Sequence, residues 1–375
     1  MEENKNKILN VPTLRFKQFQ DNWSSKRLSD IAEVVGGGTP DTTDSTLWNG
    51  GIQWFTPTEI GHSKYVSMSA RTISQLGLQK SSAKILPAGS ILLSSRATVG
   101  ECSITQKDCT TNQGFQNLTP KKGINNEFLY YLAQTQKRHF IKYASGSTFL
   151  EISNSEIKKT KCAVPGIEEQ TEIATFLSTI DKKIEVQNKI ISKYESLIKG
   201  LCDKIFRHDK SVCLSDLVKC RTSILQENEI ATYYNGEYNV FGASGIIASI
   251  NKYQFEDDGI LVLKDGSKTG KIQYAEGKYS VVGTSVVLIP NNADDARYLY
   301  FAMLSIDFDK YKVGSGIPHI YFKDYSCERI YYPNSALRIM IAKVLDAYET
   351  KVETEKEMLS ALQKQKAFLL QSMFI

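Results

Sequence analysis

The chain has 375 residues, of which 41% are hydrophobic and 23% are charged, with a net charge of +5. The length predicts two or three domains, and the composition excludes a disordered chain, a collagen and a coiled-coil rod along the whole length. The small net charge does not by itself indicate a nucleic-acid binder. The sequence contains no run of about 18 apolar residues, so no membrane-spanning helix and no membrane partner are expected.

The cysteines and histidines do not indicate a metal site or a disulfide framework. The seven cysteines include no C-x-x-C pair, and the four histidines form no H-E-x-x-H pattern. The polar residues 1–7 do not resemble a signal peptide. We therefore expect a cytoplasmic protein with reduced thiols and no bound metal.

The first part of the chain favours a mixed α/β domain. A helix-like stretch at 26–33 precedes a glycine turn at 36–40, and the apolar stretch at 90–94 predicts a strand. A second helix-like stretch covers 126–138. The pattern is of α+β type, with glycine-rich turns between short elements.

Two long helices are predicted, one over 167–206 and one over 336–374. Neither segment contains proline, and Gly200 is the only glycine in either. Each segment follows a proline, Pro165 in the first case and Pro333 in the second.

The segment between the two helices again favours a mixed α/β domain. Glycine turns at 242–245 and 314–318 enclose apolar stretches at 260–263 and 285–289, which predict strands.

The two halves of the chain form an internal repeat. From residue 142 to residue 207, matching residues lie 168 positions apart without a gap, and upstream the offset becomes 170. The matches at 168 include Gly146 with Gly314, Ile152 with Ile320, Pro165 with Pro333 and Leu177 with Leu345, and those at 170 include Gly89 with Gly259, Gly100 with Gly270 and 128–131 with 298–301. A period this long predicts two similar domains, each followed by a similar helix.

Each long helix carries a heptad seam, in which apolar residues recur at alternating steps of four and three. The first seam runs Ile173, Leu177, Ile180, Ile184, Gln187, Ile191, Tyr194, Ile198, Leu201 and Ile205. The second runs Ile341, Leu345, Tyr348, Val352, Glu355, Leu359, Leu362, Lys366, Leu369 and Met373.

The two seams are expected to pack on each other within the chain. A duplicated chain closes most simply as a pseudo-two-fold, which makes the helices antiparallel. The polar seam members Gln187, Glu355 and Lys366 then act as register devices or as breaks in the seam. The alternatives are that each helix is an amphipathic surface helix, or that each pairs with another molecule.

Charge is unevenly distributed between the two predicted domains. Residues 1–166 carry 20 basic and 13 acidic side chains, a net charge of +7, whereas residues 208–335 carry 13 and 16, a net charge of −3. The first domain is therefore the better polyanion binder. However, a loop after a predicted strand carries basic residues in both copies: Arg96 in the first, and Lys264, Lys268 and Lys271 in the second. Such a loop suits contact with phosphates or base edges, and the alternative is an exposed turn with solubilising charges.

No catalytic constellation is present in the sequence. The stretch 266–271 lacks the first glycine and the final Ser or Thr of a P-loop, and no N-P-P-Y or D-P-P-Y tetrapeptide of an amino-methyltransferase exists. The acidic pairs 257–258 and 294–295 are interpreted as solvated turn residues.

The whole chain resembles the DNA-specificity (S) subunit of a type I restriction–modification enzyme. The order of several short motifs carries the resemblance, together with the duplicated layout of a domain followed by a helix. The motifs are VPTLRF at 11–16, KRLSDI at 26–31, GGGTP at 36–40, LPAGSIL at 86–92, RATVG at 96–100, TNQG at 111–114, GST at 146–148 and VPGIEEQ at 164–170. The second copy departs from the pattern, because PNSALR at 333–338 stands where the first copy has PGIEEQ.

The resemblance implies a non-catalytic chain with four parts: a target-recognition domain at 1–165, a spacer helix at 166–208, a second recognition domain at 209–334 and a second spacer helix at 335–375. Each domain would read one half of a bipartite, asymmetric site on double-stranded DNA. The antiparallel helices would set the gap between the halves and dock two methyltransferase (M) subunits. Two translocase–nuclease (R) subunits would join for cleavage. S-adenosylmethionine, ATP and magnesium would be bound by those subunits, and this chain would bind no cofactor.

The residues expected to contact DNA are small hydroxyl, amide and basic side chains in the glycine-rich turns and the loops after strands. They are Thr39, Arg96, Thr98, Gln113 and Ser147 in the first domain, and Lys264, Lys268, Lys271, Ser315 and His319 in the second. For each, the alternative is a structural role in a turn. The competing hypothesis for the whole chain is a protein-binding scaffold, with two docking domains on a coiled-coil strut and no contact with nucleic acid.

Overall fold

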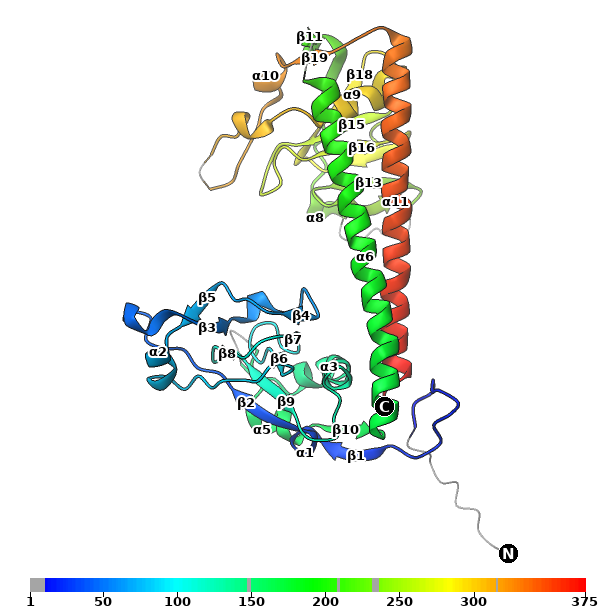
Figure 1. Cartoon of the computed structure of the whole chain (residues 1–375). Helices are drawn as coiled ribbons and strands as arrows, with labels where there is room; N and C mark the ends of the chain where they lie inside the picture. Colours follow the sequence, from blue (N-terminus) through cyan, green and yellow to red (C-terminus); the bar gives the residue numbers. More distant parts are fainter. Residues whose placement is uncertain (1–10, 147–149, 208–209, 231–235, 315) are drawn as a thin grey trace, which may run out of the picture. The chain divides into compact units, whose positions relative to one another are not determined.

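The computed structural model describes residues 11–146, 150–207, 210–230, 236–314 and 316–375 (Figure 1). The chain forms two compact units. The first holds the residues up to Glu185 together with Ser360–Ile375, and the second holds Val186–Leu359. Each long helix therefore contributes one part to each unit.

The first unit is built on a five-stranded sheet in the order β2-β9-β6-β7-β4. Neighbouring strands from β2 to β7 are antiparallel, and β4 is parallel to β7. The strands are β2 (Ala32–Gly36), β9 (Gln116–Pro120), β6 (Ile91–Leu93), β7 (Cys102–Thr105) and β4 (Tyr65–Val66). A second sheet, β5-β3-β8, joins β3 (Trp48–Phe55) antiparallel to β5 (Arg71–Ile73) and parallel to β8 (Cys109–Thr111).

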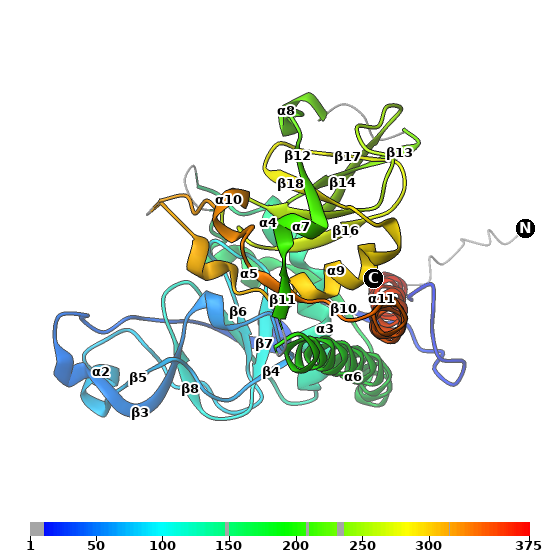
Figure 2. The ribbon, with the colours of Figure 1, turned by 90° about the horizontal axis from the view of Figure 1, so that it is seen from above.

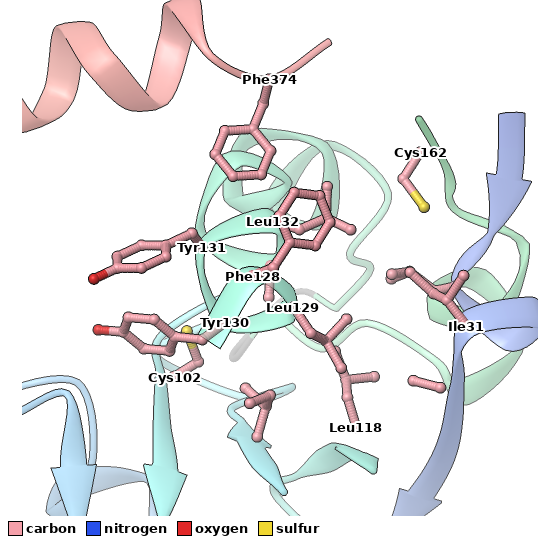
Figure 3. Packing of buried hydrophobic residues seen from close by; sticks show 14 of the residues in the cluster. Ile31, Cys102, Leu118, Phe128, Leu129, Tyr130, Tyr131, Leu132, Cys162 and Phe374 are labelled. Atoms are coloured by element: carbon pink, nitrogen blue, oxygen red, sulfur yellow. The ribbon is translucent and has the colours of Figure 1, made fainter. Parts of the chain in front are cut away.

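The core of the first unit lies between its larger sheet and helix α3 (Asn126–Thr135). The Asn125 side chain caps this helix by accepting from the backbone N–H groups of Glu127 and Phe128. Figure 3 shows Phe128, Leu129 and Leu132 of α3 among the buried side chains of this core. Phe374, from the end of the chain, stacks on Phe128 with ring centroids 5.3 Å apart. The last residues of the chain thus belong to the core of the first domain.

The second unit repeats this architecture. Its larger sheet has the order β12-β18-β15-β16, with every neighbouring pair antiparallel, and its smaller sheet has the order β14-β13-β17. The strands are β12 (Val218–Thr222), β18 (Ser285–Pro290), β15 (Gly259–Leu263), β16 (Ile272–Ala275), β14 (Gly245–Ile250), β13 (Tyr238–Gly242) and β17 (Tyr279–Val281). Helix α9 (Ala296–Met303) packs on the larger sheet as α3 does in the first unit.

The strand pairings establish how the two copies correspond. Ile91 pairs with Leu118 in the first unit, and Ile260 pairs with Leu288 in the second. Because Leu118 and Leu288 are 170 residues apart, while Ile91 and Ile260 are 169 apart, one residue is inserted between these strands. The proposed match of Gly89 with Gly259 is therefore wrong by one position.

The remaining elements border the two sheets. In the first unit they are β1 (Ser24–Arg27), α1 (Leu28–Ile31), η1 (Ser45–Leu47), η2 (Pro57–Glu59), α2 (Gln75–Gln79), α4 (Lys137–Lys142), α5 (Asn154–Lys159) and β10 (Lys161–Val164). In the second they are β11 (Lys210–Cys213), α7 (Leu214–Leu217), α8 (Glu227–Ile230), η3 (Ala293–Asp295), η4 (Phe308–Tyr311), α10 (Phe322–Tyr325) and β19 (Arg329–Tyr331). The helix predicted at 26–33 is shorter than expected, because Ser24–Arg27 forms an antiparallel pair with Lys161–Val164 instead.

The two long helices are α6 (Ile167–Phe206) and α11 (Ser335–Ser372), and they run antiparallel. In the second unit the Gln187 side-chain amide donates to Glu355, and the rings of Tyr194 and Tyr348 lie 6.4 Å apart. In the first unit Lys366 forms an ion pair with Asp181 at 2.7 Å. Figures 1 and 2 show the helices side by side. The polar seam residues thus have partners on the opposite helix, so they fix register rather than interrupt the seam.

Every apolar seam residue is buried or half-buried. The buried ones are Ile173, Leu177, Ile180, Ile191, Ile341, Leu345, Val352, Leu369 and Met373, and the half-buried ones are Ile184, Tyr194, Ile198, Leu201, Ile205, Tyr348, Leu359 and Leu362. The fold class predicted from the sequence is confirmed: two similar α/β domains, each followed by a long helix, with the helices paired antiparallel. Within the described residues, no helix is both long and apolar enough to span a membrane.

Candidate nucleic-acid interface

The loops that carry the predicted contact residues gather at one edge of each larger sheet. Because the neighbouring strands are antiparallel, the ends of β2 and β6 and the starts of β9 and β7 lie at the same edge. The first loop cluster is defined as residues 37–39, 94–101, 112–115, 145–146 and 150–152. The second loop cluster occupies the same edge of the second unit and is defined as residues 223–225, 264–271, 282–284 and 316–320.

The glycine turn of the first loop cluster is held against the strand before β9. The Gly38 N–H donates to the Thr111 carbonyl oxygen at 2.8 Å, and a Cβ on Gly37 would lie 2.0 Å from the Asn112 carbonyl oxygen. Only glycine allows this approach. It brings Thr39 and Gln113 together, so that the Thr39 hydroxyl donates to the exposed Gln113 side chain.

Arg96 lies on the loop between β6 and β7 and is held by a carboxylate from a different segment. Its Nε donates to Glu151 Oε2 at 2.9 Å, and its Nη2 lies 2.7 Å from the same oxygen. The side chains are 48% and 40% exposed. The tight turn after Arg96 places Ala97 at φ 62°, and the Thr98 hydroxyl lies 3.0 Å from that of Ser94.

The second loop cluster contains the three predicted lysines and His319. The Lys268 ammonium donates to the Ser244 hydroxyl at 3.1 Å, Lys271 is exposed and Lys264 is half-buried. The Lys264 N–H donates to the Thr284 carbonyl oxygen at 2.9 Å, which ties this loop to the start of β18. His319 bonds to Asp265 through Nδ1.

Eight of the ten predicted contact residues therefore gather in the two loop clusters. Thr39, Arg96, Thr98 and Gln113 lie in the first, and Lys264, Lys268, Lys271 and His319 lie in the second. Ser147 and Ser315 lie outside the described residues. The sequence interpretation missed Glu151 and Asp265, which bind Arg96 and His319 across long sequence separations. The one available signal was that Glu151 and His319 occupy matching positions of the repeat.

A polar cluster joins the first domain to its helix. The Lys64 ammonium donates to Ser178 of α6 at 2.6 Å and to Glu127 of α3 at 3.0 Å. The Tyr131 hydroxyl donates to Asp181 at 2.5 Å. Burial lowers the pKa of Lys64 despite its acidic partner. Burial would raise the pKa of Glu127, but hydrogen bonds, with Ser178 the strongest, outweigh it and lower that pKa.

The second unit uses different residues for the same attachment. Arg297 of α9, at the position that matches Glu127, forms ion pairs with Asp346 and Glu349 of α11. The domain helix thus carries an acid in the first copy and a base in the second, whereas both long helices present acidic side chains, Asp181 in α6 and Asp346 with Glu349 in α11. Arg297 remains charged: burial disfavours its charged form, but the hydrogen bonds that it donates to the two carboxylates raise its pKa.

The interpretation of residues 294–295 as solvated turn residues is wrong for Asp295, which is buried. Its side chain is only 3% exposed and binds Arg338 of α11, with Nε at 2.7 Å and Nη2 at 3.2 Å from its two oxygens. Arg338 also donates to the Pro333 carbonyl oxygen at 2.5 Å. In the first copy the matching Gln170 donates to the Pro165 carbonyl oxygen at 2.9 Å. Arg338 therefore replaces Gln170 at the start of the second helix.

The described residues contain no group of three or more His, Cys, Asp or Glu side chains that could hold a metal ion. Burial raises the pKa of the Cys102 and Cys162 thiols to about 12, which keeps them protonated and poorly nucleophilic.

The chain belongs to the family of type I restriction modification DNA specificity domains, whose family model matches residues 20–196 and 209–364. The two matches correspond to the two copies of the repeat. Members of this family are specificity subunits rather than catalytic ones, in agreement with the sequence interpretation.

Curated relatives carry the same description. The MjaIX specificity subunit of Methanocaldococcus jannaschii is 40% identical over 178 residues, which cover 46% of this chain and 41% of the relative. The EcoR124I/EcoR124II specificity subunit of Escherichia coli is 26% identical over 203 residues, which cover 49% of this chain and 50% of the relative. The EcoprrI subunit of Escherichia coli is 21% identical over 355 residues and 86% of each chain. The chain thus spans no more than half the length of the first two relatives.

Solved structures share the fold over nearly the whole chain. The S subunit of a type I restriction-modification system from M. genitalium aligns with a TM-score of 0.62 and 18% identity, covering 97% of this chain and 99% of the other. A chain from a study of complex assembly and conformational transition in the type I R-M system aligns with a TM-score of 0.56 and 14% identity, covering 95% and 98%. At these identities the likeness establishes the fold.

Proposed function

We propose that this chain gives a type I restriction–modification complex its DNA target, with each loop cluster contacting one half of a bipartite, asymmetric site. The observation that carries the proposal is the duplication itself. The two loop clusters occupy the same edge of two equivalent sheets, yet their side chains differ, with Arg96 and Gln113 in one and three lysines in the other. Two similar scaffolds with different contact residues suit two different DNA sequences.

The paired helices would set the number of unread base pairs between the two half-sites. A coiled coil of fixed register has a fixed length, and half-site spacing follows from the geometry of a paired reader. The bonds between Gln187 and Glu355 and between Asp181 and Lys366 fix that register in the two units.

The helices would also dock two methyltransferase subunits, one at each copy of the repeat. Phe176 and Val344 support this, because these repeat-matched positions both expose an apolar side chain, 37% and 49% respectively. Two translocase–nuclease subunits would join for cleavage. S-adenosylmethionine, ATP and magnesium would be bound by these partners, and this chain would contribute no catalytic group.

The test is selection from a pool of random DNA duplexes by the chain assembled with its methyltransferase subunits. The proposal predicts enrichment of two short, different segments separated by a gap of constant length. If the assembled complex enriches no sequence, the protein-scaffold hypothesis is correct instead.

A matched pair of substitutions distinguishes the loop cluster from general surface charge. Lys268→Gln in the second loop cluster is expected to weaken binding to all sequences and to reduce the salt dependence by about one counterion, because the residue suits a phosphate contact. Lys219→Gln removes the same charge from an exposed position within β12 and is expected to change neither. Equal effects of the two substitutions would contradict a specific role for the cluster.

A further inference from the structure

We propose that the two loop clusters recognise bases with opposite hydrogen-bonding polarity. Arg96, held by Glu151, presents donors to a guanine, whereas Asp265, held by His319, presents an acceptor to the amino group of a cytosine. This inference rests on the proposed function and assigns a base class to one position in each half-site.

Backbone hydrogen bonds establish that Arg96 and Asp265 occupy the same place in the two copies. The Ile152 N–H donates to the Ser95 carbonyl oxygen at 2.9 Å, and the Ile320 N–H donates to the Lys264 carbonyl oxygen at 3.0 Å. The next residue on each loop then pairs with the residue before the isoleucine, which gives Arg96 with Glu151 and Asp265 with His319.

The pairing also corrects the position of Arg96 within the repeat. The offset of 170 would align Arg96 with Gly266. The isolated bridges of the structure instead match Arg96 with Asp265, at an offset of 169. The inserted residue therefore lies within the loop itself. A cation in one copy corresponds to an anion in the other, and the partner changes from an acid to a histidine.

Arg96 has the geometry of a restrained donor. Arg96 contacts Glu151 through two atoms, Nε and Nη2, and its third nitrogen, Nη1, makes no contact with Glu151. A guanidinium has five N–H donors in a rigid plane and no acceptor. The carboxylate of Glu151 already restrains the half-exposed Arg96 side chain, so this side chain loses less conformational freedom when it binds the O6 and N7 acceptors of guanine. Guanine is the commonest base partner of arginine in DNA recognition.

Asp265 has the geometry of a restrained acceptor. His319 bonds to Oδ1 and does not engage Oδ2. An ionised carboxylate only accepts, so the Nδ1 of His319 carries the proton in this bond. The His319 ring is itself placed by Tyr321, with ring centroids 4.2 Å apart. Carboxylates accept from the N4 amino group of cytosine and repel the acceptor pair of guanine.

The exposure of both pairs indicates a role outside stability. The side chains of Arg96 and Glu151 are 48% and 40% exposed, and those of His319 and Asp265 are 27% and 33% exposed. Ion pairs at such positions contribute little to folding. Substitutions at these four residues are therefore expected to give folded chains.

The experiment maps the methylated sequences produced by the complete complex containing the native chain, Arg96→Gln or Asp265→Asn. Arg96→Gln is expected to relax one guanine position, by about 5- to 150-fold in relative methylation, in one half-site only. Asp265→Asn is expected to relax one cytosine position in the other half-site and to shift its preference towards adenine, the partner of asparagine.

Matched controls remove the same charges from the opposite edge of the sheets. The control substitutions are Lys107→Gln and Asp257→Asn. Lys107 lies in the turn after β7, Asp257 lies just before β15, and both side chains are exposed. These controls are expected to leave the methylated motif unchanged. Glu151→Gln retains Arg96 but weakens its restraint, so it is expected to reduce discrimination at the same guanine position as Arg96→Gln, with rescue by Glu151→Asp.

Two results would overturn the inference while leaving the proposed function intact. In the first, the native complex methylates a bipartite motif, but Arg96→Gln or Asp265→Asn weakens every sequence equally, as expected for a phosphate contact. In the second, both substitutions relax the same half-site. If the native complex methylates no bipartite motif, the proposed function fails, and this inference fails with it.

Discussion

The ion pair between Arg338 and Asp295 offers a test of how the second domain is attached to its helix. Arg338→Gln introduces the residue that the first copy carries at the matching position, Gln170. The substitution leaves the carboxylate of Asp295 buried without its cation. It also removes the contact of the guanidinium over the Tyr332 ring, whose centroid lies 4.0 Å away.

The expected destabilisation follows from the burial of the pair. Arg338 and Asp295 side chains are 10% and 3% exposed, and loss of one partner from such a pair costs about 3–5 kcal/mol. Tyr332 and Asn292 still donate to Asp295, at 2.6 Å and 3.1 Å, so we expect the lower end, about 3 kcal/mol.

The double substitution Asp295→Asn with Arg338→Gln tests the physical reason. It recreates the Asn125 and Gln170 combination of the first copy, in which no charge is buried, and it should recover about 2 kcal/mol of the loss. Lys343→Gln removes a charge from the exposed face of α11 and should change stability by less than about 0.5 kcal/mol.

The assay is urea unfolding combined with amide hydrogen exchange, which reports the two units separately. Exchange should accelerate in α9 and β18 and remain unchanged in α3. The reasoning is refuted if Arg338→Gln costs no more than the Lys343 control, or if the double variant is no more stable than the single one.

Three further predictions follow from the core and from the titrating groups. Leu177→Ala and Leu345→Ala, at matching buried seam positions, should each cost about 2–5 kcal/mol by urea unfolding, and a cost below 1 kcal/mol would contradict the seam. Because the pKa of Glu127 is lowered on folding, the free energy of unfolding should fall as the pH drops below 4.5. Glu127→Gln should weaken this pH dependence, and an identical pH profile for the variant would show that Glu127 does not contribute to it. A thiol reagent should modify exposed Cys327 before Cys109, whose pKa burial raises to about 11; the opposite order in peptide mapping would contradict the structure.

Features repeated along one segment could be predicted from the sequence. The heptad pattern from Ile173 to Leu201 predicted both a long helix and its buried face, because helix periodicity is a local property. The short strand Ser24–Arg27 was missed, because its pairing with Lys161–Val164 lies more than a hundred residues away. Its local sequence gave no signal for that partner.

Contacts between distant segments were the part that sequence reasoning could not supply. Arg96 was selected as a contact residue, but Glu151 lies 55 positions away and was not connected with it. Asp295 was placed in a solvated turn, since the polar stretch N-N-A-D-D at 291–295 favours a turn and says nothing about burial. The repeat was visible, whereas its one-residue insertion at the loop became clear only from the strand pairing.

Whether the helices set the distance between two recognised DNA segments can be measured by removing one heptad from each. Residues 184–190 and 352–358 can be deleted together, because Gln187 and Glu355 are opposite each other and the seam continues from Ile180 to Ile191. Seven residues at about 1.5 Å each shorten the helices by about 10 Å, which is about three base pairs of DNA. Methylation mapping should return the same two segments with a gap about three base pairs shorter. A motif with an unchanged gap, or one continuous motif from the native complex, would contradict the account.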